Sequence, residues 1–262
     1  MSFADAAQVR SAETSVPAPR EQSAAAQDAV AGLAEVERAT QALYEAVDAL
    51  DHVLLRGPSL LPGWTRAHVV THLARNADAL VNLLTWAKTG VEHPMYPSAA
   101  DRDADIEEGA GRQPQLLRAD LDAACQRFAA AARDLPATAW EAEVVHPHSG
   151  VLLAHRVPWL RLREVWFHLV DLDAGVGFRD LPGHLLEGFL DDAVGQYADR
   201  ADVPDVRVDV TLPDGRQRSW ELTARSGSTA VSGSAADVLG WLTGRHSGAL
   251  LNGTAPTLPR WL

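Results

Sequence analysis

Four long stretches of the chain repeat apolar residues at the three- and four-residue spacing of an amphipathic α-helix. They cover roughly residues 22–50, 65–90, 113–134 and 154–174. Each stretch carries an apolar stripe that has to be buried against another element. Thr65 is the expected N-cap of the second helix, which is expected to end at Gly90. Connections of moderate length separate the four stretches, and the pattern predicts a four-helix bundle.

The connections differ in character. LRGPSLLPGW, before Thr65, is predicted to be a turn. The segment HPMYPSAADRDADIEEG, residues 93–109, is rich in Pro, Asp and Ser, and is predicted to form a long connection. Residues 136–153 contain two prolines and a glycine and are predicted to form a loop or a hairpin.

The pattern changes after Gly175. Residues 183–202 are predicted to be helical, and two runs that alternate apolar with polar residues follow, VRVDVTL and SWELTA, joined by the hairpin signal PDGR. A short strand over residues 229–232 and a helix over 235–243 complete a small α+β unit. We therefore expect a mobile arm over residues 1–20, a bundle over 21–176 and a small domain over 177–262.

Composition excludes several classes of protein. The chain has 262 residues, 47% of them hydrophobic, and a net charge of −12 without a basic stripe, so we expect no nucleic-acid partner. No signal peptide or membrane-spanning stretch is evident, and we expect a cytoplasmic protein. The one cysteine, Cys125, cannot form an internal disulfide. It lies in an Ala-rich helix with no cation predicted beside it, so it is expected to be a buried apolar residue and not a nucleophile.

One group of residues indicates chemistry. In RLREVWFHLVDLD, Glu164 and His168 are four residues apart, so a helix presents both on one face. The second predicted helix offers His68 and His72, of which His72 lies nearer its buried face. Two histidines and one glutamate are a ligand set of catalytic zinc, which keeps a position open for water or substrate.

A structural interpretation of the same residues also exists. Each histidine would then be a hydrogen-bonded residue of the core or surface, and Glu164 would pair with Arg161 or Arg163. Spacing along the sequence does not separate this interpretation from the metal site.

The chain resembles the mycothiol-dependent maleylpyruvate isomerases in five segments that occur in order and span most of residues 60–262. They are LPGWTRAHVVTHLARNADAL, LLTWAKTGVEHPMYPS, RLREVWFHLVDL, VSGSAADVLGWLTGR and LPRWL. The resemblance implies a mostly α fold, with a DinB-like four-helix bundle followed by a small α+β domain. It also implies zinc bound by His72, Glu164 and His168, and functional arginines at Arg245 and Arg102.

The resemblance further implies a function. A zinc-bound mycothiol thiolate would add reversibly to maleylpyruvate, a small dianion, and convert it to fumarylpyruvate during gentisate-type degradation of aromatic compounds. Arg245 would hold a substrate carboxylate and stabilise the enolate, in a pocket between the domains. The alternative for Arg245 is a cation at a helix C-terminus, and for Arg102 a solvated loop charge among aspartates.

Two other functions remain open at this point. The same metal site would serve a mycothiol S-transferase, which consumes the thiol that an isomerase returns unchanged. A non-catalytic binding or regulatory protein would use the metal only to join two helices. The sequence predicts neither the oligomeric state nor the residues that contact mycothiol.

Overall fold

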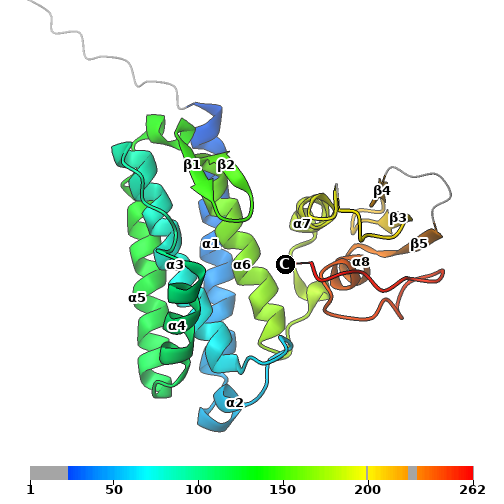
Figure 1. Ribbon diagram of the computed structural model, residues 1–262, viewed down its shortest axis with the longest axis horizontal. Coiled ribbons are helices and arrows are strands. Elements are labelled where there is room, and N and C mark those ends of the chain that lie inside the picture. The colour runs from blue at the N-terminus through cyan, green and yellow to red at the C-terminus, as the bar shows by residue number, and fades with distance from the viewer. Residues whose placement is uncertain (1–22, 199, 224–228, 262) are drawn as a thin grey trace, which may run out of the picture.

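The computed structural model describes residues 23–198, 200–223 and 229–261, and it places two groups of elements side by side (Figure 1). Long helices form one group, and shorter helices with a small sheet form the other. This arrangement confirms the predicted mostly α fold with an α+β unit at its C-terminal end. The expected arm, residues 1–20, lies outside the described residues.

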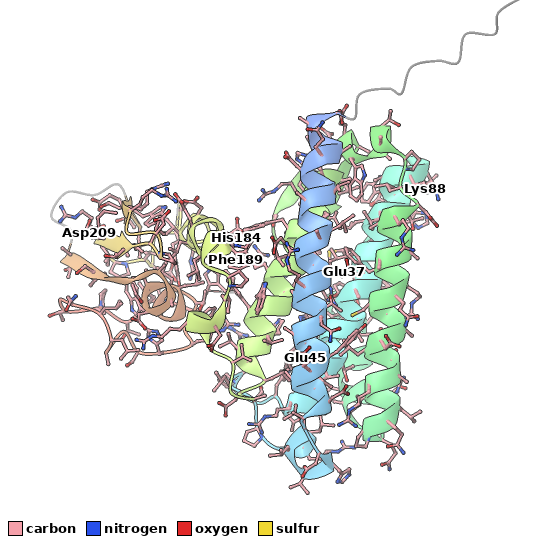
Figure 2. The ribbon with its side chains drawn as sticks, turned by 180° about the vertical axis from the view of Figure 1, so that it is seen from behind. Glu37, Glu45, Lys88, His184, Phe189 and Asp209 are labelled. Atoms are coloured by element: carbon pink, nitrogen blue, oxygen red, sulfur yellow. The ribbon has the colours of Figure 1, made fainter. Side chains whose placement is uncertain are left out.

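Four helices make the bundle, and they coincide with the four periodic stretches. They are α1 (Ala24–Asp48), α3 (Arg66–Thr89), α5 (Pro114–Arg133) and α6 (Val157–Asp171). Helix α3 packs against α5 and α6, and α1 packs against α6. Fully buried leucines fill the space between them: Leu43, Leu73, Leu80, Leu83, Leu84, Leu121 and Leu162. Polar residues such as Glu37, Glu45 and Lys88 lie on the exposed faces (Figure 2).

The start and end of α3 are fixed by local chemistry. The Thr65 hydroxyl accepts a hydrogen bond from the backbone N–H of His68, and the Thr65 N–H donates to Nδ1 of His68 at 3.1 Å. This reciprocal capping box satisfies two N–H groups that a helix start leaves without partners. Gly90 ends the helix with a left-handed φ of 71°. Both predicted ends of this helix are therefore confirmed.

Two connections contain helices that the sequence interpretation missed. Helix α2 (His52–Arg56) overlaps the first two residues of the predicted turn, and α4 (Ala99–Ala110) lies in the predicted long connection, where the expectation was wrong. Ser98 caps α4 by accepting from the backbone N–H of Asp101 at 3.1 Å. The apolar stripe of α4 is short, because only Ile106, Gly109 and Ala110 are buried and most of the other residues of the helix are acidic. Such a stripe gives little periodicity.

Residues 136–153 contain the hairpin that was one of the two expectations. Strands β1 (Glu143–His146) and β2 (Gly150–Leu153) pair antiparallel. A 3-10 turn over Ala154–Arg156 leads directly into α6.

The C-terminal unit combines two helices with a three-stranded sheet. Helix α7 (Gly183–Gly195) is shorter than predicted, and β3 (Val206–Thr211), β4 (Gln217–Glu221), β5 (Thr229–Ser234) and α8 (Ala235–Leu242) follow it. The sheet order is β4-β3-β5, with β3 antiparallel to β4 and parallel to β5. The hairpin predicted at PDGR joins β3 to β4.

Aromatic side chains join the two groups of elements. The ring of Trp159 on α6 lies 4.9 Å from that of Phe189 on α7, and the ring of Phe167 lies 5.3 Å from that of Trp261. His184 and Phe189 lie on the part of α7 that faces the bundle (Figure 2). His184 also pairs with Glu35 of α1, at 2.9 Å.

Among the described helices, none combines the length and apolarity needed to cross a bilayer.

Candidate metal centre

Three side chains from α3 and α6 converge on one point. Nε2 of His72 lies 2.9 Å from Oε2 of Glu164, and Nε2 of His168 lies 3.5 Å from the same oxygen. One ligand atom from each residue falls within 4.8 Å of the other two. The structure thus brings together the three residues that the sequence singled out. The alternative pairing of Glu164 with Arg161 or Arg163 does not occur among the described contacts, because Arg161 contacts α3 and Arg163 contacts Asp192.

Helix geometry explains the convergence. Glu164 and His168 are one turn apart on α6, so their side chains leave the helix on one face. Helix α3 packs against this face and supplies His72, whose ring centroid is 4.5 Å from that of His168. His72 is buried, whereas the side chains of Glu164 and His168 are 21% and 14% exposed. The group is therefore anchored on its α3 side and accessible on its α6 side.

His68, the other histidine of α3, has a different role. Its Nδ1 faces the Oγ1 atom of Thr65 at 2.6 Å and accepts from the Thr65 N–H, and its Nε2 lies 3.3 Å from Glu107. Both ring nitrogens are therefore engaged at the start of the helix. This supports the preference for His72, which rested on the position of the buried face.

The protonation states of His72 and Glu164 suit metal binding, and a metal ion at His168 would have to displace a proton from the ring. Burial, together with the charge of His168, lowers the pKa of His72 to about 4, so its imidazole is neutral near pH 7. Burial raises the pKa of Glu164, but hydrogen bonds from His168 and His72 outweigh burial and hold that pKa well below its usual range. Burial likewise lowers the pKa of His168, and hydrogen bonds with Asp171 and Glu164 reverse this effect and raise it. A carboxylate held between two imidazoles is a donor set that fits a divalent transition metal.

Arg102 extends from α4 toward this group. Its Nη2 lies 3.3 Å from Nδ1 of His72, and its guanidinium carbon lies 6.0 Å from the ring centroids of both Trp64 and Tyr96. Nη1 forms an ion pair with the exposed Asp103 at 2.7 Å. Arg102 is therefore a cation at the edge of the group, held by two aromatic rings and still 30% exposed.

Arg245 reaches the group from the C-terminal unit, but by an indirect path. Its Nε and Nη2 donate to the two carboxylate oxygens of Asp171 at 3.0 and 2.7 Å. Oδ2 of Asp171 in turn lies 2.8 Å from Nδ1 of His168. One residue, Asp171, thus separates the guanidinium of Arg245 from the proposed metal ligand His168.

The sequence interpretation missed Asp171, Trp64 and Tyr96. Asp171 carried a usable signal, since it follows His168 by three residues and therefore shares its helix face. Tyr96 and Trp64 lie in connections, where no periodicity indicates what a side chain contacts. Burial and the charge of Glu164 raise the pKa of Tyr96 to about 12, so its phenol stays protonated.

The expectation that no cation lies beside Cys125 was wrong. Nη2 of Arg161, a residue only 1% exposed, lies 3.3 Å from Sγ of Cys125. The other terminal nitrogen of Arg161 donates to the Leu73 carbonyl and to Oδ1 of Asn76. Cys125 is nevertheless buried in the bundle, as predicted.

Comparisons with known proteins agree with this architecture. A family model described as the mycothiol maleylpyruvate isomerase N-terminal domain matches residues 36–173. Two crystal structures are also similar, one of the mycothiol-dependent maleylpyruvate isomerase and one of a histidine-to-alanine mutant of it. Each is 30% identical in sequence with a TM-score of 0.83, and each match covers 89% of this chain and 97% of that chain. The comparison with curated proteins finds no match.

The family match runs from the middle of α1 to just past the end of α6 and includes all three residues of the candidate metal centre. The structural match extends through the C-terminal unit as well. The chain belongs to the mycothiol-dependent maleylpyruvate isomerase family.

Proposed function

We propose that this protein catalyses the cis–trans isomerisation of maleylpyruvate to fumarylpyruvate with mycothiol as its thiol cofactor. The observation that carries the proposal is the convergence of His72, Glu164 and His168, in a chain whose similarity to a solved isomerase covers 97% of that protein. We further propose that the three residues hold zinc, because two imidazoles and one carboxylate leave a coordination position open. Zinc bound there supplies a Lewis acid that lowers the pKa of a coordinated thiol.

The chain itself supplies no accessible thiol. Cys125 is 7% exposed and faces Arg161 inside the bundle. A thiol that reacts at the site therefore has to come from a small molecule, which supports the use of mycothiol.

The reaction is balanced without an oxidant or a reductant. The thiolate sulfur forms a bond to one alkene carbon, and the π electrons move onto the conjugated carbonyl oxygen to give an enolate. The former double bond is then single and rotates. When the enolate collapses, the carbon–sulfur bond breaks, the trans alkene forms and the thiol is released unchanged. The protein has to position two anionic ends of the substrate and stabilise the enolate charge.

Arg102 is the group that the contacts favour for a substrate carboxylate. It is partly exposed and lies against His72. When Nε2 of His72 is a metal ligand, the proton of the neutral ring resides on Nδ1, which then no longer accepts from Arg102. This frees a guanidinium nitrogen for a carboxylate. Arg245, to which the sequence hypothesis gave the carboxylate, has two of its nitrogens on Asp171.

The protonated phenol of Tyr96 is suited to donate a hydrogen bond to the enolate oxygen. It lies beside Arg102, and its pKa of about 12 keeps the proton in place at neutral pH. We place the reaction in the cytoplasm, within gentisate-type degradation of aromatic compounds.

The decisive experiment follows the absorbance of maleylpyruvate with zinc-loaded protein, with and without mycothiol. We expect isomerisation only when mycothiol is present, with the thiol titre constant during turnover. A falling titre indicates an S-transferase. If chelation lowers the melting temperature and added thiol never reaches the metal, the protein is a metal-stapled binding protein and the proposal is wrong.

A further inference from the structure

Asp171 is a buried carboxylate at the end of α6 that joins the two parts of the molecule. It is 0% exposed, and its Oδ2 atom lies 2.8 Å from Nδ1 of His168 and 2.7 Å from Nη2 of Arg245. Oδ1 accepts a second hydrogen bond from Nε of Arg245 at 3.0 Å. A chain of contacts therefore runs from Arg245 in the C-terminal unit through Asp171 to a proposed metal ligand.

The placement of Arg245 is fixed on the C-terminal side. Gly244 adopts a left-handed φ of 74° after the end of α8, and this turn directs Arg245 back toward the bundle. Nη1 of Arg245 donates to the carbonyl of Thr243 at 2.8 Å. The ring of Phe167, on α6, and the ring of Trp261, near the C-terminus, both lie close to Arg245. The centroid of each ring is 5.8 Å from the guanidinium carbon. Only 12% of the side chain is exposed.

These contacts bear on His168 in two ways. When Nδ1 carries the proton and donates to Asp171, the lone pair of Nε2 faces Glu164 and His72, which is the tautomer that a metal requires. The same hydrogen bond fixes the rotation of the ring. A buried carboxylate needs a cationic partner, and the two parallel hydrogen bonds from Arg245 also fix its plane.

We propose that Asp171 and Arg245 are positioning residues that orient His168, so that the C-terminal unit sets the metal affinity of the bundle. This inference rests on the proposed function only in requiring that His72, Glu164 and His168 bind a metal. It gives the second unit a role in forming the metal centre in addition to any contact with substrate.

The test measures binding of zinc alone to the full-length chain, by competition with a chromophoric chelator and without mycothiol or maleylpyruvate. Loss of an outer partner of a ligating histidine weakens binding about 10- to 100-fold. We expect this loss for Asp171→Asn and for Arg245→Ala. Arg245→Lys keeps the cation but lacks the paired donors, so its affinity should lie between these variants and wild type.

Two further readouts separate positioning from a general loss of stability. The visible absorption of Co²⁺ at the site reports ligand geometry, and we expect its bands to change in Asp171→Asn. The double variant Asp171→Asn/Arg245→Ala should bind zinc no more weakly than whichever single variant binds it less tightly. The reason is that the effects of substitutions are not additive when the two residues act as a unit. Thermal melting of the metal-free variants identifies any variant that fails to fold. If Arg245→Ala or Asp171→Asn does not fold, the zinc affinity of the milder variant Arg245→Lys decides the test.

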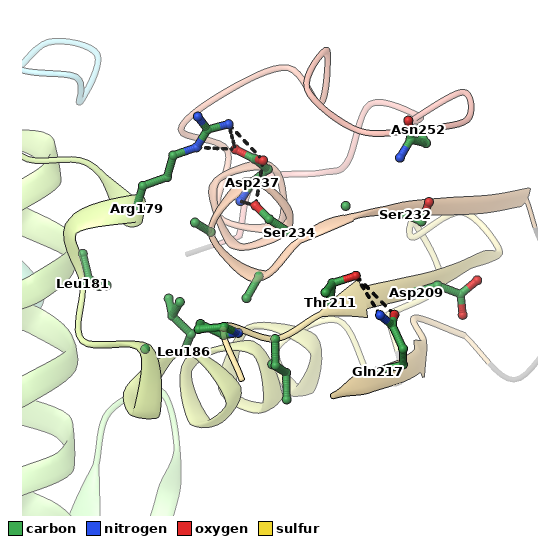
Figure 3. A pocket seen from close by; sticks show the side chains of 16 residues that line it. Arg179, Leu181, Leu186, Asp209, Thr211, Gln217, Ser232, Ser234, Asp237 and Asn252 are labelled. Atoms are coloured by element: carbon green, nitrogen blue, oxygen red, sulfur yellow. Dashed lines mark hydrogen bonds and ion pairs between the residues drawn. The ribbon is translucent and has the colours of Figure 1, made fainter. Parts of the chain in front are cut away.

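A matched control is available at the other end of α8. Arg179 donates to both carboxylate oxygens of Asp237, and the pair lies at the rim of an open groove in the C-terminal unit (Figure 3). Asp237 also accepts from the hydroxyl of Ser234, at 2.7 Å, and none of its described contacts is with a metal ligand. Arg179→Ala should therefore leave zinc affinity within about twofold of wild type.

Zinc affinity within twofold of wild type in both Arg245→Ala and Asp171→Asn, with unchanged Co²⁺ spectra, overturns the proposal. If Arg245→Ala then raises the KM for maleylpyruvate alone, Arg245 holds a substrate carboxylate instead. A wild-type protein that binds zinc but does not isomerise maleylpyruvate contradicts the proposed function and leaves the positioning role standing. A wild-type protein that binds no zinc contradicts both.

Discussion

Arg102 lies at the edge of the candidate metal centre and is the residue that we propose to bind a substrate carboxylate. It lies against His72 with Trp64 and Tyr96 beside it, and its partner Asp103 is solvent exposed. An exposed ion pair contributes little, so substrate competes for this guanidinium at small cost. Arg102 is therefore placed to bind a carboxylate without first breaking a buried pair, unlike Arg245.

Replacing Arg102 by Met should lower kcat/KM for maleylpyruvate about 10- to 100-fold, because a charge-assisted hydrogen bond to the substrate is lost. Zinc affinity should stay within about twofold of wild type, since Arg102 donates nothing to the metal. Steady-state kinetics and chelator competition measure the two quantities. Arg127→Ala is the control, because Arg127 pairs with Asp78 on the bundle surface. An unchanged kcat/KM in Arg102→Met removes Arg102 from substrate binding.

His146 provides a pH-dependent contribution to stability outside the metal centre. Its Nδ1 accepts hydrogen bonds from the backbone N–H groups of His148 and Ser149, which protonation of that nitrogen would break. Burial, with the charge of Arg163 adding to it, lowers the pKa of His146 from 6.5 to about 4. Between pH 6.5 and about 4, the imidazole of His146 is therefore neutral in the folded protein but protonated in the unfolded chain.

The free energy of unfolding should accordingly fall as the pH drops from 6.5 to about 4. The contribution of His146 over this range is about 3 kcal/mol. His146→Asn keeps an acceptor oxygen without the titration, so urea unfolding of metal-free protein should show a shallower pH dependence. His184→Gln, at an exposed position, should retain most of the wild-type slope. Equal slopes for His146→Asn and wild type would rule out this role.

At the scale of elements, α4 is the part of the fold that brings Arg102 to the site. It packs against α3 through a close approach at Gly109, where an added Cβ would meet Cγ2 of Thr71 at 2.3 Å. Thr71 directly precedes His72, and its hydroxyl donates to the Ala67 carbonyl at 2.9 Å. The lack of a Cβ at position 109 therefore permits the close approach of α4 to α3, the helix that carries His72.

Gly109→Ala should destabilise the fold by about 1–3 kcal/mol through overpacking and lower activity by displacing Arg102. Thr71→Ser removes the methyl group that meets the new Cβ but keeps the hydroxyl, so the double variant should recover much of both losses. Urea unfolding and kcat/KM measure the recovery. If Thr71→Ser rescues neither quantity, the contact between the two helices is not the cause.

At the scale of the whole molecule, the proposed metal would join two helices, and the second unit contacts the same group through Arg245 and Asp171. Binding to the folded state alone raises the free energy of unfolding by about 2.7 kcal/mol when free zinc is 100 times its Kd. We expect zinc to raise the melting temperature of wild type and chelation to reverse the rise. His72→Ala should show no zinc-dependent shift, whereas His184→Gln should shift as wild type does. A shift that persists in His72→Ala would place the bound metal elsewhere.

Local patterns in the sequence determined the four long helices and which helix faces carry the residues of the candidate metal centre. The apolar spacing of α1, α3, α5 and α6 repeats within each helix, and Glu164 and His168 lie on one face because a helix turns every 3.6 residues. The Thr65 cap and the PDGR hairpin also depend on neighbouring residues alone. The choice of His72 over His68 followed from the same periodicity, because a helix face is a local property.

The tertiary structure decided everything that depends on contacts between distant residues. Packing of α3 on α6 brings His72 to Glu164, and the turn after α8 brings Arg245 onto Asp171. Arg161 reaches Cys125, and β5 pairs parallel with β3, through contacts that no local spacing encodes. Helix α4 escaped prediction because its stability depends on a few buried residues against α3. Periodicity fixes which face of an element is buried, whereas the identity of its partner is decided only when the chain folds.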